Sequence, residues 1–186
     1  EQVRSRLPDG LRGPLFGALG ALYPKLDWAP KPLRAKSTLQ ALARDSVEGY
    51  FHSVSILHDG LRRRLYSPAM HRELHGYQGV EVLRRHMGKA PTDHHLSRVQ
   101  YADLKTYLPG DILTKVDRAS MAHSLEVRVP ILDHHFVEWS AGLAPELKLN
   151  GREGKAIFKA ALKPFVPEEI LYRPKMGFAV PLTAWF

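Results

Sequence analysis

A mainly α-helical fold is predicted by three features of this 186-residue sequence. Apolar residues recur at helical spacing in long stretches, above all in residues 37–54 and 94–123. Prolines and glycines lie between these stretches, at positions that end one helix or begin the next. No series of strand patterns alternates with the helices, as a parallel sheet would require. The predicted fold therefore has at most short extended pieces.

Residues 1–93 form the first predicted segment, which is irregular, helical in patches, and rich in proline, glycine and arginine. Three prolines make residues 24–35 an irregular connector. One helix is expected to follow through residues 37–54, with Ser37 or Thr38 as its cap.

Two shorter helices are expected later in this segment. Ser67 is placed to cap a helix over residues 68–75, with Pro68 in its first turn, where a missing N–H costs nothing. Residues 78–87 are predicted to form a second helix that ends at Gly88.

Residues 94–186 form the second predicted segment, which is also helical. Residues 94–107 carry an apolar helical face, and Pro109 then begins a new helix. Asp111 and Lys115 stand four residues apart on that helix and are expected to pair.

The later part of this segment alternates short helices with irregular stretches. Residues 125–130 alternate between apolar and other side chains, which predicts an extended conformation. Asp133 is expected to cap the next helix. Residues 150–151 form a turn, residues 155–162 a helix, and residues 167–169 begin a last helical turn.

Composition indicates a soluble protein that works in the cytoplasm. The chain has no cysteine, which excludes disulfides and thiolate chemistry within it, and no apolar run approaches the ~20 residues needed to cross a bilayer. It begins at Glu1 and ends at Phe186, and both ends are expected to be cuts in a longer protein.

The net charge of +8 raises the question of nucleic-acid binding. However, the basic residues are spread along the chain, and only residues 62–64 form a basic run. Aromatic residues do not interleave with the basic ones as they would on a surface that stacks single-stranded bases. A solvated basic surface, or attraction to anionic substrates such as nucleotides, explains the charge equally well. No nucleic acid is therefore expected as a partner.

Charged residues are densest around the end of one helix and the extended segment that follows it. Asp117, Arg118, Glu126 and Arg128 flank apolar residues that are expected to be buried. Buried charges need partners, and residues of the preceding helix could supply them. From spacing alone, a structural ion-pair network is the favoured interpretation.

A second cluster, residues 151–155, has the sequence Gly-Arg-Glu-Gly-Lys. A glycine-rich turn that delivers a lysine to a helix start is typical of phosphate binding. The spacing differs from a P-loop, however, and alone it would more often be a turn with a solvated lysine. Residues 173–178 combine two cations with a phenylalanine in a loop.

Two pairs of adjacent histidines, residues 94–95 and 134–135, are poor metal ligands. Neighbouring side chains on a helix diverge, and no cysteine or His-Glu-x-x-His pattern accompanies them. No metal site is predicted.

Taken together, these clusters resemble the asparagine synthase domain of glutamine-hydrolysing asparagine synthetases and related amidotransferases. The similar motifs occur in the family's order over roughly residues 95–186, and the first half resembles the family only loosely. They comprise residues 111–122, 125–133, 145–148, 154–155, 167–171, 173–178 and 180–181.

The resemblance implies an enzyme with two parts. A glutaminase domain would release ammonia, and a synthetase domain would use ATP and Mg²⁺ to adenylate a carboxylate, aspartate by default, before ammonia displaces AMP. It also implies that this chain is the helical C-terminal portion of an adenine-nucleotide α-hydrolase-like synthetase domain. The phosphate-binding Ser-Gly-Gly loop and the parallel sheet would lie outside the chain.

Site residues are carried over from the family one by one. The resemblance implies that Lys155 faces the acyl-adenylate and is the catalytic residue. Asp117 and Arg118 would border the substrate site, whereas His123, Glu126 and Arg128 are assigned to scaffolding.

The isolated fragment is expected to be inactive and to bind no cofactor. Its expected partners are its own glutaminase domain, the ATP-binding sheet, an aspartate-like substrate, and other copies of itself through exposed apolar surface. The alternatives are a non-enzymatic helical interaction module and a basic nucleic-acid-binding domain, whose affinity would fall steeply with salt.

Overall fold

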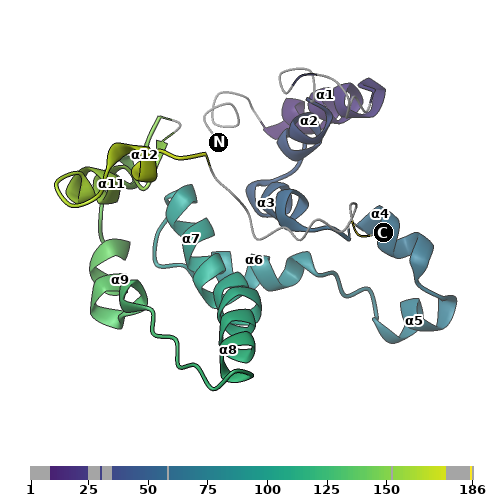
Figure 1. Cartoon of the computed structure of the whole chain (residues 1–186). Helices are drawn as coiled ribbons and strands as arrows, with labels where there is room; N and C mark the ends of the chain where they lie inside the picture. The colour runs from purple at the N-terminus through teal and green to yellow at the C-terminus, as the bar shows by residue number, and fades with distance from the viewer. Residues whose placement is uncertain are drawn as a thin grey trace. The chain divides into compact units, whose positions relative to one another are not determined.

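The computed structural model describes residues 9–24, 30, 35–57, 59–151, 153–174 and 185 (Figure 1). Their fold is mainly α, as predicted, and their sheet is a single antiparallel pair of two-residue strands. The chain divides into two compact units, Glu1–Arg128 and Val129–Phe186. The division into residues 1–93 and 94–186 rests on composition and stays a prediction. No helix in the described ranges has the length and apolar character to cross a membrane.

The first unit contains short helices and one π-helical stretch, η3. Its elements are α1 (Asp9–Leu22), α2 (Lys36–Leu42), α3 (Ser46–Val54), α4 (Asp59–Leu65), α5 (Pro68–Glu73), α6 (Val80–Gly88), α7 (His95–Lys105), η3 (Leu108–Leu113) and α8 (Thr114–Met121).

A small apolar core forms where α3, α6 and α7 meet. Its buried members are Val47, Val80, Leu83, Met87 and Ala102. The Met87 side chain is 1% exposed, and truncating a methionine that is so well buried typically costs about 2–5 kcal/mol. The core therefore fixes these three helices against one another.

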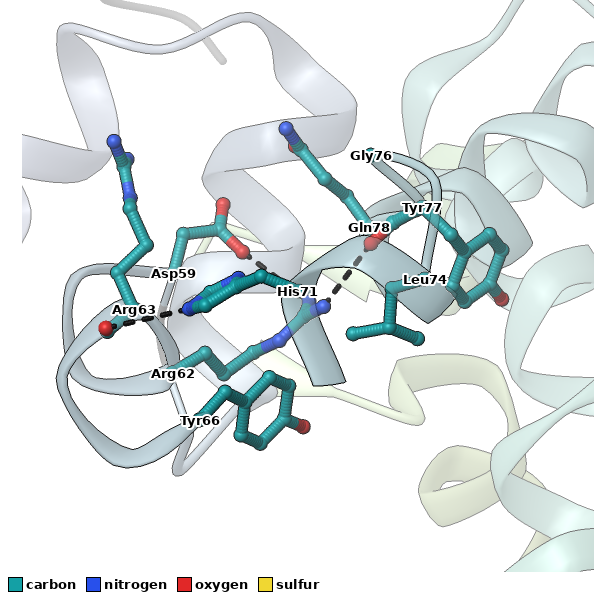
Figure 2. A pocket seen from close by; sticks show the side chains of 9 residues that line it. All are labelled: Asp59, Arg62, Arg63, Tyr66, His71, Leu74, Gly76, Tyr77 and Gln78. Atoms are coloured by element: carbon teal, nitrogen blue, oxygen red, sulfur yellow. Dashed lines mark hydrogen bonds and ion pairs between the residues drawn. The ribbon is translucent and has the colours of Figure 1, made fainter. Parts of the chain in front are cut away.

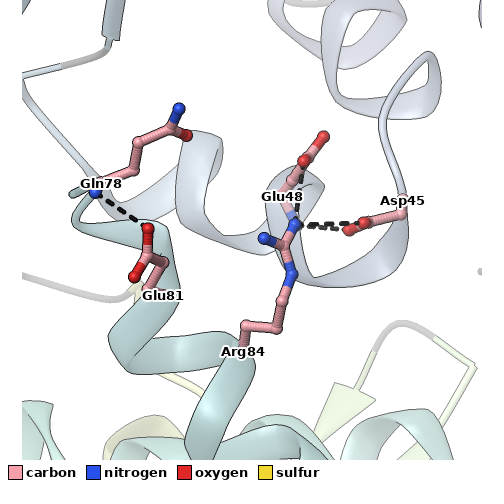
Figure 3. A network of polar contacts seen from close by, with 5 residues as sticks. All are labelled: Asp45, Glu48, Gln78, Glu81 and Arg84. Carbon is pink, nitrogen blue, oxygen red and sulfur yellow. Dashed lines mark hydrogen bonds and ion pairs between the residues drawn. The ribbon is translucent and has the colours of Figure 1, made fainter. Parts of the chain in front are cut away.

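The single helix predicted over residues 37–54 is in fact two helices, α2 and α3. Asp45 interrupts it with an extended backbone and caps α3 by accepting the Glu48 N–H at 2.7 Å. Arg84 of α6 reinforces the corner, with its Nη2 atom 2.9 Å from Glu48 Oε1 and 3.6 Å from Asp45 Oδ2 (Figure 3). The prediction of one helix relied on apolar spacing, which continues across Asp45 even though this residue caps a second helix.

The predicted caps had mixed outcomes. Ser37 and Thr38 lie inside the first turn of α2, which begins at Lys36, so neither occupies the cap position. Ser67 does cap α5, accepting the Met70 N–H at 3.2 Å. Of the predicted connector, residues 25–29 and 31–34 lie outside the described part of the chain.

Other local predictions are confirmed. Residues 94–107 contain α7, and Lys115 Nζ lies 3.0 Å from Asp111 Oδ1. The Asp111–Lys115 pair connects residues close in sequence, which is why spacing alone predicts it. At the start of α6, Glu81 accepts the Gln78 N–H at 3.2 Å, a hydrogen bond that we did not predict from the sequence (Figure 3).

The second unit consists of short helices around a β-hairpin. Its elements are η4 (Pro130–Leu132), α9 (His134–Ala141), α10 (Pro145–Lys148), β1 (Leu149–Asn150), β2 (Glu153–Gly154), α11 (Ala156–Leu162) and α12 (Glu168–Leu171).

Polar links hold the elements of the second unit together. Asp133 caps α9 as predicted, accepting the N–H groups of His135 and Phe136 at 3.0 and 3.3 Å. The Lys148 ammonium donates to the Ala141 carbonyl at 3.0 Å, and partial burial lowers the pKa of Lys148. Among the described residues, every fully buried apolar side chain belongs to the first unit.

Candidate functional site

The β-hairpin of the second unit carries the candidate catalytic lysine. Asn150 pairs with Glu153 and Leu149 with Gly154, so the chain reverses within two residues. Gly151 takes a left-handed φ of 59°, a conformation that suits glycine in a tight turn, and thereby confirms the predicted turn. Arg152, the other turn residue, lies outside the described residues.

Lys155 joins the hairpin to α11 and adopts a left-handed backbone, with φ 60° and ψ 33°. It occupies the N-cap position, and its carbonyl accepts the Lys159 N–H at 2.9 Å. Gly154 belongs to β2, and the left-handed position lies one residue later, at Lys155. For a residue with a Cβ, this conformation costs about 1–2 kcal/mol, and the surrounding hairpin and helix hold it in place.

The side chain of Lys155 is exposed, and its ammonium forms neither a hydrogen bond nor an ion pair with any described residue. Such an ammonium is available to an anionic ligand, because it has no protein partner to displace. This is the property that the proposed role requires.

A network that the sequence did not reveal surrounds the start of α11. Lys159 Nζ lies 3.0 Å from Glu153 Oε1 and 4.6 Å from the centroid of the Tyr172 ring. Lys163, one turn later, lies 3.1 Å from Glu168 Oε1. The spacing of four residues between successive lysines was visible in the sequence, but the partners come from the hairpin and from the segment around α12.

Asp117 and Arg118 are consecutive exposed residues on α8 in the first unit. Their side chains form no hydrogen bond or ion pair within the described part of the chain. Lys155 belongs to the second unit, so the structure does not gather the three predicted site residues within one unit.

The extended segment after α8 differs from its prediction. Its apolar residues are exposed, among them Leu125 at 59%, so the expected burial is wrong for the described residues. Glu126 and Arg128 bind each other at 2.6 Å instead of meeting partners from the preceding helix. Both side chains are largely exposed to solvent.

A cavity of about 250 Å³ lies beside α4 and α5 in the first unit (Figure 2). Its central cation is Arg62, which lies 3.3 Å from Asp59 Oδ1, donates to the Tyr77 carbonyl at 3.1 Å, and stacks over the Tyr66 ring. The His71 ring nitrogen lies 3.4 Å from the Arg63 carbonyl. These polar groups are satisfied by the protein itself, so we assign no ligand to the cavity.

The described residues contain no group of three or more histidine, aspartate or glutamate side chains that could hold a metal ion. The rings of His134 and His135 lie close together, with centroids 3.8 Å apart and planes tilted by 39°. The loop expected at residues 175–178 lies outside the described residues.

The chain is a mainly helical structure in which a β-hairpin presents an exposed lysine. Comparison with known proteins identifies the family to which it belongs. The model of the asparagine synthase family matches residues 15–186. The chain belongs to the asparagine synthase family.

Curated relatives agree with this assignment. Asparagine synthetase [glutamine-hydrolyzing] 1 of Bacillus subtilis is 29% identical over 97% of this chain and 27% of its own length. A putative asparagine synthetase of Mycobacterium bovis is 36% identical over 86% of this chain and 26% of its own length. The human asparagine synthetase is 35% identical over 53% of this chain and 18% of its own length. The chain thus spans about a quarter of the length of the first two relatives, and no solved structure was found to match it.

Proposed function

We propose that this chain is part of a glutamine-dependent, ATP-dependent ligase of the asparagine synthetase type, acting in amino-acid biosynthesis in the cytoplasm. Aspartate is the proposed acceptor, and ammonia released from glutamine is the proposed nucleophile. The remainder of the enzyme would supply the glutaminase domain and the site for ATP and Mg²⁺. The names of the curated relatives, which describe asparagine synthetases, support this class of reaction.

Lys155 carries the part of the proposal that concerns this chain. When ammonia adds to an activated carboxyl group, negative charge develops on the carboxyl oxygen. A fixed cation beside that oxygen stabilises the transition state more than the ground state, which is the condition for catalysis. The supporting observation is that the Lys155 ammonium is exposed, unpaired within the described residues, and attached to a backbone held by the hairpin and α11.

The test is Lys155→Ala in the full-length protein. Loss of a donor that stabilises developing charge typically costs about 3–4 kcal/mol, so we expect amide synthesis to fall about a hundred- to a thousandfold. Glutaminase activity and the melting temperature should stay close to wild type. Lys155→Arg should restore little synthesis, because a planar guanidinium does not replace a compact ammonium.

Lys115→Ala is the matched control. Lys115 of α8 is also an exposed lysine, but it is paired with Asp111 of η3, and its removal should leave synthesis unchanged. If Lys155→Ala retains more than about half of wild-type synthesis, the loss is too small for a missing charge donor, and the catalytic role of Lys155 is rejected.

A further inference from the structure

The lysines at the start of α11 have different environments, although they stand one helical turn apart. The Lys159 side chain is only 22% exposed, and its ammonium is 3.0 Å from Glu153 Oε1. The Lys155 ammonium has no partner among the described residues. Of these two cations, one is therefore neutralised by the protein, and the other is free to meet a ligand.

The Glu153–Lys159 ion pair spans Lys155. Glu153 lies in β2, two residues before Lys155, and Lys159 lies in α11, four residues after it. Inside this bridge, the Lys159 N–H donates to the Lys155 carbonyl at 2.9 Å. The ion pair joins the hairpin to α11, and the hydrogen bond joins Lys155 itself to α11. Together they restrict the left-handed backbone of Lys155.

Tyr172 holds the bridge from a third part of the unit. Its ring centroid lies 4.6 Å from Lys159 Nζ, within the range of a cation–π contact. The Lys159 ammonium therefore contacts both Glu153 and Tyr172. A partly exposed ion pair contributes little to global stability, so the main effect of this bridge is on local geometry.

We propose that Glu153 and Lys159 are positioning residues that fix the direction of Lys155 and leave its ammonium as the available cation. This inference rests on the proposed catalytic role of Lys155. Glu153 and Lys159 act through the backbone at Lys155 and touch no reacting atom.

A double-mutant cycle in the full-length protein tests the coupling. Misplacing a catalytic group by about 1 Å can cost about a hundredfold in rate, so Glu153→Gln should lower the kcat of amide synthesis about 10- to 100-fold. In the Lys155→Ala background, the same substitution should change kcat less than about twofold, because no ammonium remains to be positioned. Lys159→Gln removes the same bridge from its other end and should behave alike.

Two further variants separate positioning from general effects. Lys115→Gln breaks the exposed Lys115–Asp111 pair, which lies outside the hairpin and α11, and should keep wild-type kcat. Exchanging the charges with Glu153→Lys and Lys159→Glu together should recover more kcat than either reversal alone.

The outcomes are distinct. An unchanged kcat in both Glu153→Gln and Lys159→Gln overturns the positioning role, as does an equal loss in the wild-type and Lys155→Ala backgrounds. Retained synthesis in Lys155→Ala alone instead overturns the proposed function of Lys155, and this inference with it. A loss confined to proteins that contain Lys155 supports the inference.

Discussion

At the scale of single residues, Lys155 combines a side chain that has no partner among the described residues with a left-handed backbone. Few residues with a Cβ adopt this backbone conformation. Strain of this kind persists only where neighbouring structure imposes it, and it is frequent at functional sites. Here the register of the hairpin and the first hydrogen bond of α11 impose the strain on Lys155. Neither feature can be deduced from the sequence Gly154-Lys155.

Tyr50 gives a pH-dependence at the same scale. Its hydroxyl donates to Asp103 Oδ1 at 2.5 Å, and burial, together with this bond to a carboxylate, raises the pKa of Tyr50 well above its ordinary value of about 10. A raised pKa means that the fold favours the neutral phenol. This contribution to stability is fully present below about pH 10 and declines as pH rises above it.

We therefore expect the free energy of unfolding to fall more steeply between about pH 9.5 and 11 in the wild-type chain than in Tyr50→Phe, because phenylalanine has no proton to lose. Urea denaturation at a series of pH values measures this difference. Tyr77→Phe is the control, since that side chain is exposed and should leave the wild-type slope unchanged. Parallel curves for the wild type and Tyr50→Phe would contradict the assignment.

At the scale of elements, local signals explain what the sequence could predict. Asp133, Ser67 and the Asp111–Lys115 pair act within one turn of helix, so their residue types and spacing suffice. The break at Asp45 was also locally encoded, because a capping aspartate followed three residues later by Glu48 marks a helix start. The continuous apolar period through residues 37–54 outweighed that signal in our prediction.

At the end of α8, Ser124 occupies a backbone position that would suit glycine better. Ser124 adopts a left-handed φ of 57°, with its N–H bonded to the Met121 carbonyl and the Leu125 N–H bonded to the Ser120 carbonyl, both at 3.0 Å. These two bonds form a Schellman motif, in which the left-handed position normally holds glycine.

Ser124→Gly should consequently stabilise the chain by about 0.4–1 kcal/mol, because glycine removes the left-handed cost. Thermal or chemical denaturation measures the change. Ser120→Gly is a matched control inside α8, where the same substitution should destabilise by about 0.5–1 kcal/mol. Equal effects of the two substitutions would show that the left-handed cost at Ser124 is negligible.

At the scale of the whole molecule, composition and periodicity were enough to predict a mainly α fold, but not which residues are covered. Burial depends on contacts between segments far apart in sequence, and these leave no local pattern. The segment after α8 shows this limit, because its alternating apolar residues are exposed here rather than buried. Likewise, the Glu153–Lys159–Tyr172 network links three elements whose arrangement the sequence alone did not reveal.

Exposed apolar surface leads to the prediction of self-association. Large apolar side chains are exposed in both units, including Ile56 in the first and Phe165 in the second. Burying such surface releases about 25 cal/mol per Å². This chain should therefore form concentration-dependent oligomers and bind an apolar dye, as sedimentation velocity and dye fluorescence would show.

The segment after α8 offers a specific variant for this test. Leu125 and Val127 are 59% and 45% exposed and flank Glu126. Replacing both with glutamine removes apolar area without altering charge, so association and dye binding should weaken together. Glu126→Gln combined with Arg128→Gln is the control in the same segment, and it should leave association at least as strong, because the apolar side chains remain. A wild-type chain that stays monomeric at high concentration and binds no dye would contradict the prediction.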